Sequence, residues 1–127
     1  MTNTSIGLLL LRIFIGSRLM YGVLDNLISW DHMQEFAGFL GKYKFPFPMV
    51  SAIVSVAVQM IAGFLILIGW QTKLSAAIIF INFLIAIFMV YLPNGDSIEL
   101  MTPALALLFV SASLFFTGAG KYSVDKV

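Results

Sequence analysis

The fold is decided first by residues 6–28, which read IGLLLLRIFIGSRLMYGVLDNLI. This run is long enough to cross the roughly 30 Å hydrocarbon core of a bilayer as one helix. It carries Arg12, Arg18 and Asp25 among its apolar residues. Because a charged side chain is costly at that depth and usually serves a function, the run predicts a transmembrane helix that also holds candidate functional residues.

The composition of the whole chain extends this interpretation to the other apolar runs. The 127 residues are 61% hydrophobic and only 10% charged, which is not typical of a soluble domain. Runs such as residues 61–68 do not alternate with polar residues, as the strands of a membrane barrel would. We therefore predict an all-α integral membrane protein with transmembrane helices at about residues 6–28, 49–70, 74–92 and 98–118.

The connections between these spans predict how the helices are arranged. Residues 71–73 and 93–97 are short links that force sequential helices to lie antiparallel, so we expect an antiparallel four-transmembrane-helix bundle. The longer connection, residues 29–48, has apolar residues at helical spacing. It predicts a short interfacial helix after helix one, with Asp31 as its N-cap and Gln34 three residues later.

Small residues predict where the first two spans touch. Gly7 and Gly16 lie in the first span, and Gly63 lies in the second. Glycine has no side chain beyond its Cα, so two membrane helices can approach closely where glycines face each other. We expect close helix contacts at these positions.

The net charge and the small numbers of cysteine and histidine residues exclude several classes of function. A net charge of +1 leaves no basic patch for nucleic acid. The chain has no cysteine, so any redox group must come from another molecule. His32 is the single histidine, which excludes a haem held by two histidines of this chain. No cluster of His, Asp and Glu has metal-ligand spacing, so we expect neither a metal nor a haem.

The basic residues outside the apolar cores predict the orientation. Lys73, Lys121 and Lys126 fall on one side of the predicted bundle, whereas Lys42 and Lys44 fall on the other. Cytoplasmic loops of membrane proteins carry the excess of lysine and arginine. This distribution predicts a multi-pass protein of the cell inner (plasma) membrane with both termini cytoplasmic.

Polar residues within the spans predict a ligand pocket inside the bundle. The side chains that we expect to line it are Arg18, Tyr21, Gln59, Arg12 and Asn82. Counting residues from the membrane faces puts Arg18 and Gln59 near mid-depth, and it puts Arg12 and Asn82 together nearer the inner face. An arginine always keeps its charge and offers several donors, so it would bind and orient the oxygen of a quinone-like ligand.

Two carboxylates are candidates for proton transfer. Asp25 and Glu99 lie toward the outer face, where a carboxylate shielded from water could take up and release a proton. Side chains on a helix lean toward its N-terminus, so we expect Arg18 to lean away from Asp25. The alternative is that the embedded polar residues only hold the bundle together, through interhelical contacts of about 1 kcal/mol each.

Three sequence motifs point to a known family. Residues 9–16 read LLLRIFIG, residues 63–69 read GFLILIG with TKL at 72–74, and residues 118–125 read GAGKYSVD. In their order and spacing these motifs resemble the DoxX family of small four-helix membrane proteins. The resemblance covers nearly the whole chain, so we expect one DoxX-like transmembrane domain over residues 1–127.

The resemblance implies a bacterial or archaeal inner-membrane protein. The named members of that family include a subunit of thiosulfate:quinone oxidoreductase and partners in membrane oxidoreductase complexes. This chain departs from the family pattern after Gly16, where a histidine-glycine and then a lysine are common and the chain has Tyr21-Gly22 and Asn26. Gln59 stands where the family commonly has a glutamate. If the family positions move protons, both departures weaken the transfer of that activity.

Two functions are consistent with this set of residues. The first is a membrane subunit of a redox-linked, quinone-associated oxidoreductase, which binds a small lipid-soluble molecule and needs a partner for the electron-carrying group. The second is a non-enzymatic accessory or assembly subunit that anchors or stabilises a larger membrane complex. We expect membrane lipids and a protein partner, or a second copy of the chain, as neighbours, and quinone as the only cofactor.

Overall fold

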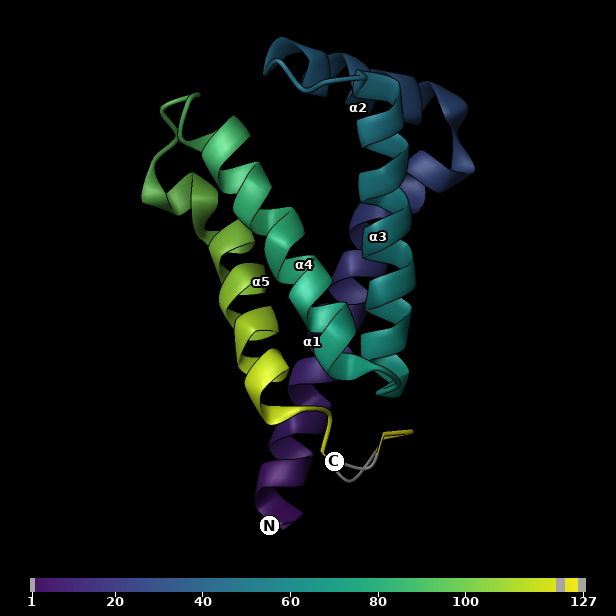
Figure 1. Ribbon diagram of the computed structural model, residues 1–127, viewed down its shortest axis with the longest axis vertical. Helices are drawn as coiled ribbons and strands as arrows, with labels where there is room; N and C mark the ends of the chain where they lie inside the picture. Colours follow the sequence, from purple (N-terminus) through teal and green to yellow (C-terminus); the bar gives the residue numbers. More distant parts are fainter. Residues whose placement is uncertain (1, 121–122, 126–127) are drawn as a thin grey trace.

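The computed structural model describes residues 2–120 and 123–125. Within them the chain forms only helices, which confirms the predicted all-α fold (Figure 1). In chain order these are α1 (Thr2–Ile28), α2 (Trp30–Lys42), α3 (Pro48–Ile68), α4 (Thr72–Ala86), a π-helical segment η1 (Ile87–Tyr91) that continues α4, and α5 (Ile98–Thr117).

Four of these segments are long and apolar enough to cross a membrane. They are Asn3–Ile28, Pro48–Ile68, Thr72–Tyr91 and Ile98–Thr117. The chain is therefore a multi-pass membrane protein with four spans, as the sequence predicts. Lys121 and Lys126, two of the residues used for the orientation, lie outside the described residues.

Two helix ends differ from the predicted limits for local reasons. The first helix begins at Thr2 rather than residue 6, because its polar first residues also adopt helical structure. The second span ends at Ile68 rather than residue 70. Gly69 there adopts a left-handed conformation with φ of 76°, and the N–H groups of Gly69 and Trp70 both return to the carbonyl oxygen of Leu65. This arrangement closes the helix.

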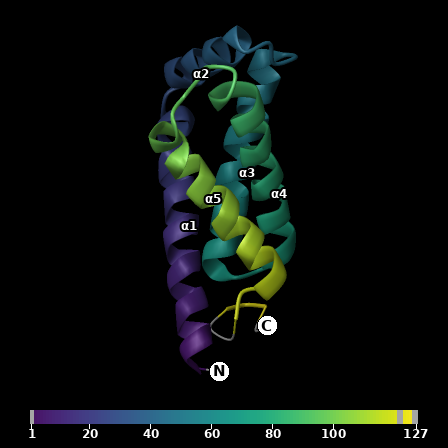
Figure 2. The same cartoon turned by 90° about the vertical axis from the view of Figure 1, so that its left-hand side faces the viewer.

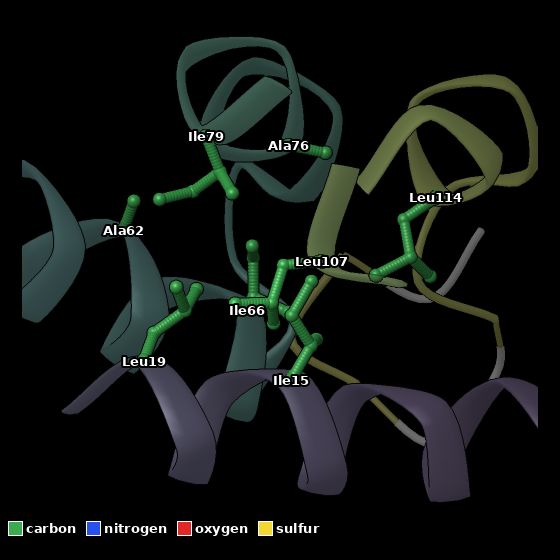
Figure 3. Close-up of a cluster of buried hydrophobic side chains, with 8 residues drawn as sticks. All are labelled: Ile15, Leu19, Ala62, Ile66, Ala76, Ile79, Leu107 and Leu114. Atoms are coloured by element: carbon green, nitrogen blue, oxygen red, sulfur yellow. The ribbon is translucent and has the colours of Figure 1, made fainter. Parts of the chain in front are cut away.

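The long helices form two pairs, α1 with α3 and α4 with α5. The pairs meet at the end of the bundle that holds the start of α1 and the residues after α5, and they separate toward α2 (Figure 1). A buried cluster with residues from all four long helices joins them (Figure 3). Its members are Ile15, Leu19, Ala62, Ile66, Ala76, Ile79, Leu107 and Leu114.

Glycines set the closest approach of α1 and α3. A Cβ placed on Gly16 would lie 2.7 Å from the carbonyl oxygen of Gly63. A Cβ on Gly63 would lie 3.0 Å from the Cβ of Leu19. The predicted contact is confirmed at both positions. It is wrong for Gly7, where a Cβ would have no atom within 4 Å, because Gly7 lies outside the crossing point of the two helices.

The helix α2 lies across the open end of the bundle (Figure 2). Its buried residues Met33, Ala37 and Leu40 pack against residues of α1 and α3. The predicted short helix is therefore confirmed, but its predicted cap is wrong. Ser29 occupies the N-cap position without a side-chain cap, and Asp31 lies inside the first turn.

The end of the third span changes from α to π geometry, which the sequence does not predict. The N–H of Leu92 donates to the carbonyl oxygen of Ile87 at 3.0 Å, one residue farther back than in an α-helix. Segments of π-helix are rare in proteins, and those that occur often lie at functional sites. Here the segment carries Met89, Val90 and Tyr91 into the wall of a cavity.

Candidate functional site

A cavity of about 790 Å³ lies between the two helix pairs, on the side of α2. Its walls are mainly apolar and aromatic, with Phe36 contributed by α2 and Phe83 by α4. The polar side chains in its lining come from α1, α3, α4, η1 and the loops at this end. They are Arg18, Asn26, Tyr43, Ser51, Ser55, Gln59, Asn82, Tyr91, Asn94 and Asp96. Three of the five predicted ligand-binding residues, Arg18, Gln59 and Asn82, are among them.

A row of hydrogen bonds crosses the cavity wall from α3 to α4. The Nε2 of Gln59 donates to the Oγ of Ser55 at 3.1 Å. The Oγ of Ser55 then donates to the Oδ1 of Asn82 at 3.1 Å. Asn82 takes part in this row only as an acceptor, through its Oδ1, so the two N–H donors of its Nδ2 remain for another acceptor.

Arg18 extends along α1 toward the end covered by α2. A Cβ on Gly22 would lie 2.6 Å from the Nη1 of Arg18, so the guanidinium crosses the surface that Gly22 leaves open. The prediction that Arg18 leans toward the N-terminus is therefore wrong. Gly22, one turn toward the C-terminus, has no side chain, so the guanidinium can lie over it. Within the described part of the chain, Arg18 has no ion pair, and its side chain lines the cavity.

The remaining predicted residues lie elsewhere. Tyr21 is 76% exposed and does not line the cavity. Asp25 and Glu99 are exposed and are also absent from its lining. The carboxylate in the lining is Asp96, which accepts a hydrogen bond from the Nδ2 of Asn94 at 2.7 Å. Asp96 follows the third span in a short loop, where sequence patterns do not indicate which way a side chain points.

Arg12 lies at the other end of the bundle, in a different environment. It is only 1% exposed and donates to backbone carbonyl oxygens of two segments. Its Nε reaches Ile66 at 3.0 Å, and its Nη2 reaches Leu67 at 3.0 Å, both at the end of α3. Its Nη1 reaches Ala119, after α5, at 3.1 Å. The last carbonyls of a helix carry partial negative charge, so the guanidinium caps α3 and ties the chain after α5 to it.

The position of Arg12 shows that Arg12 and Asn82 do not lie at the same depth, contrary to the prediction from the sequence. Counting along the spans puts Arg12 and Asn82 at the same level. The bond to Ser55 instead places Asn82 beside the first half of α3, whereas Arg12 contacts the end of that helix. The two residues are therefore separated along the bundle axis, because residue counting does not register the tilt between the two helix pairs.

Asp125 caps the next helix beside Arg12. Its carboxylate accepts from the backbone N–H groups of Gln71 at 3.0 Å and Thr72 at 2.9 Å, at the start of α4. The backbone N–H of Asp125 donates to the carbonyl of Gly69 at 2.8 Å. We call Arg12, Ala119 and Asp125, with the ends of α3 and α4 that they bind, the Arg12 network.

The pKa of Asp125 reflects this environment. Burial raises the pKa, but the N–H donors of Thr72 and Gln71 and the positive charge of Arg12 lower it below the usual range. The nearby Thr72 hydroxyl acts in the same direction, although it makes no full hydrogen bond to any residue that the structure describes. The carboxylate is therefore held in its charged form.

The Arg12 network brings together the three motifs on which the resemblance rests. Arg12 belongs to the first, Gly69 to the second, and Ala119 and Asp125 to the third. Lys121 and Tyr122 of the third motif lie outside the described residues. These motifs therefore mark a structural junction at one end of the bundle, away from the cavity.

A sequence profile of the DoxX family matches residues 7–92. This range contains Arg12, Arg18, Gln59 and Asn82, and it ends at the last residue of the predicted third span. No curated protein and no solved structure matches the chain.

Proposed function

This chain belongs to the DoxX family, and from that premise we propose that it is a membrane subunit of a redox-linked, quinone-associated oxidoreductase complex. In this proposal it binds a small lipid-soluble molecule in the cavity between its helix pairs. One observation carries the proposal. The donors of Arg18 and the hydrogen-bonded row of Gln59, Ser55 and Asn82 line the same cavity, whose other walls are mainly apolar.

The chemistry of a quinone matches this arrangement of groups. A quinone ring has two carbonyl oxygens that accept hydrogen bonds, and the rest of the molecule is apolar. Arg18 and the Nδ2 of Asn82 supply donors, while Phe36 and Phe83 supply apolar surface for a ring. A permanent positive charge would also stabilise the negative charge that develops on a quinone oxygen during reduction. A volume of about 790 Å³ is in the range of small-molecule sites.

The electron-carrying group would lie on a partner protein. The chain has no cysteine and one histidine, so it offers few ligands for a metal centre of its own. For proton transfer, Asp96 is the carboxylate in the cavity lining, whereas Asp25 and Glu99 lie outside it at the same end. We propose that the complex resides in the inner membrane with both termini of this chain cytoplasmic.

The first test is native mass spectrometry after gentle extraction from the native membrane. We expect a quinone to be retained by the wild-type protein and lost from Arg18→Leu and Asn82→Leu. Tyr21→Phe is the matched control, because it removes one hydroxyl from α1 outside the cavity lining. Far-UV circular dichroism should show that all three variants remain folded.

The outcomes separate the two candidate functions. Loss of quinone from Tyr21→Phe but not from Arg18→Leu would show that the ligand does not bind in this cavity. A stoichiometric protein partner without any small molecule would support the accessory or assembly role instead. The Arg12 network favours neither outcome, since it binds backbone groups of the same chain.

A further inference from the structure

A second groove, of about 550 Å³, lies beside the cavity at the end covered by α2. Residues from the end of α2 and the turn after it form one wall, and residues from the end of the third span and the loop after it form the other. The lining residues are Lys42, Tyr43, Lys44, Phe88, Met89, Pro93 and Asn94. Tyr43, Met89 and Asn94 line the cavity as well, so the two spaces are neighbours.

The backbone after α2 places two lysines in this groove. Lys44 has a left-handed conformation with φ of 63°, and its N–H donates to the carbonyl of Gly41 at 3.2 Å. The turn therefore folds back on the last residues of α2, and both Lys42 and Lys44 line the same groove. A left-handed lysine is uncommon, because its Cβ crowds the backbone there.

The charge in the groove is unbalanced. No acidic residue lines it, and within the described residues neither Lys42 nor Lys44 forms an ion pair. The nearest carboxylate in sequence to Asn94, that of Asp96, lines the neighbouring cavity and accepts a hydrogen bond from Asn94. Two lysines and an asparagine thus line a groove that has no acidic residue in its lining.

The groove also crosses the boundary of the membrane span. The third span ends at Tyr91. Phe88, 62% exposed, and Met89 lie inside that limit, whereas Pro93 and Asn94 lie beyond it. The apolar residues of the groove therefore belong to the span, and Lys42 and Lys44 share the groove with Pro93 and Asn94, which lie just beyond it.

From this arrangement we infer that the groove binds the phosphate of an anionic phospholipid, with the acyl chain lying against Phe88 and Met89. Lysines near an anionic lipid surface contribute about fivefold each to binding, so the pair should contribute about 25-fold. The inference does not depend on the ligand of the cavity, because Arg18 and Asn82 do not line the groove.

The test uses the full-length protein in detergent with added lipid, and native mass spectrometry counts the lipids retained. We expect phosphatidylglycerol to bind more tightly than phosphatidylcholine of the same chain length. We expect Lys42→Gln with Lys44→Gln to lower the affinity for phosphatidylglycerol about 25-fold and to leave phosphatidylcholine unchanged. Lys73→Gln is the control, because Lys73 is exposed at the opposite end of the bundle.

Three results would overturn the inference. The first is equal binding of the two lipids to the wild-type protein. The second is an equal loss of phosphatidylglycerol from Lys73→Gln and from the double lysine variant. The third is displacement of phosphatidylglycerol by glycerol phosphate at similar concentrations, which would assign the site to a free phosphate ester. Quinone retention should be unchanged in the lysine variants, so failure here is distinct from failure of the proposed function.

Discussion

The most direct test of the Arg12 network is Arg12→Met, which keeps a long apolar side chain and removes the guanidinium. The variant removes the three Arg12 donors that lie 3.0 to 3.1 Å from the carbonyl oxygens of Ile66, Leu67 and Ala119. It also leaves Asp125 without the positive charge that lowers its pKa. All of these groups lie around a side chain that is 1% exposed, so little water can replace the lost partners.

The size of the effect follows from these contacts. A hydrogen bond to a charged group contributes about 1.5 to 3 kcal/mol, and such contributions within one network do not add fully. Removing one partner of a buried charged network costs about 3 to 5 kcal/mol. We therefore expect Arg12→Met to lower the free energy of unfolding by about 3 to 5 kcal/mol.

The matched control is Arg18→Met in the same helix. Arg18 lines an open cavity and has no ion pair among the described residues, so its replacement should change stability by about 0.5 kcal/mol. Unfolding would be followed in detergent micelles with increasing dodecyl sulfate. Trp70 follows Gly69, so its fluorescence in a Trp30→Phe background reports on the end of the bundle that holds the Arg12 network.

The double variant Arg12→Met with Asp125→Asn tests whether the two residues act together. We expect a coupling energy of about 0.5 to 3 kcal/mol, because the charge of Arg12 acts on the carboxylate of Asp125. Equal stability of Arg12→Met and Arg18→Met would refute the structural role of Arg12. Loss of bound quinone from a folded Arg12→Met would instead support the ligand-binding role that the sequence predicts.

Three further predictions concern helix packing, pH and the cavity. Gly63→Ala should cost about 1 to 3 kcal/mol, because its Cβ would press on Leu19 at 3.0 Å; Gly7→Ala, with no atom within 4 Å, should be neutral or stabilising in the same unfolding assay. The lowered pKa of Asp125 stabilises the folded state above the ordinary aspartate pKa of about 3.9, and this contribution is lost as the pH falls through the lower folded value. Stability measured against pH should therefore fall less steeply below about pH 4 in Asp125→Asn, and an unchanged slope would contradict the capping role. Gln59→Leu should weaken binding of a quinone analogue about two- to tenfold in a fluorescence titration, since it removes the first donor in the hydrogen-bonded row of Gln59, Ser55 and Asn82. Unchanged affinity would show that this row does not position Asn82.

Much of the fold follows from local sequence patterns. Burial in lipid depends on the length and hydrophobicity of each segment, so the four spans can be located without knowledge of their neighbours. Glycine in an apolar span predicts the close approach at Gly16 and Gly63, but it fails at Gly7, because only the tertiary structure decides where the helices cross. The π-helical end of the third span carries no such signal, and neither does the direction in which Arg18 extends.

The roles of the two embedded arginines show where this reasoning stops. Residue type and hydrophobic surroundings are the same for Arg12 and Arg18, and from them the sequence determines only that α1 carries two positive charges through an apolar span. Arg12 donates to backbone carbonyls that lie 54, 55 and 107 residues away in the chain. Every residue has such a carbonyl, so no pattern of side chains can indicate which one will accept a hydrogen bond. Only the tertiary structure, by bringing the ends of α3 and α5 to Arg12 and leaving Arg18 beside a cavity, decided which arginine caps a helix and which is available to a ligand.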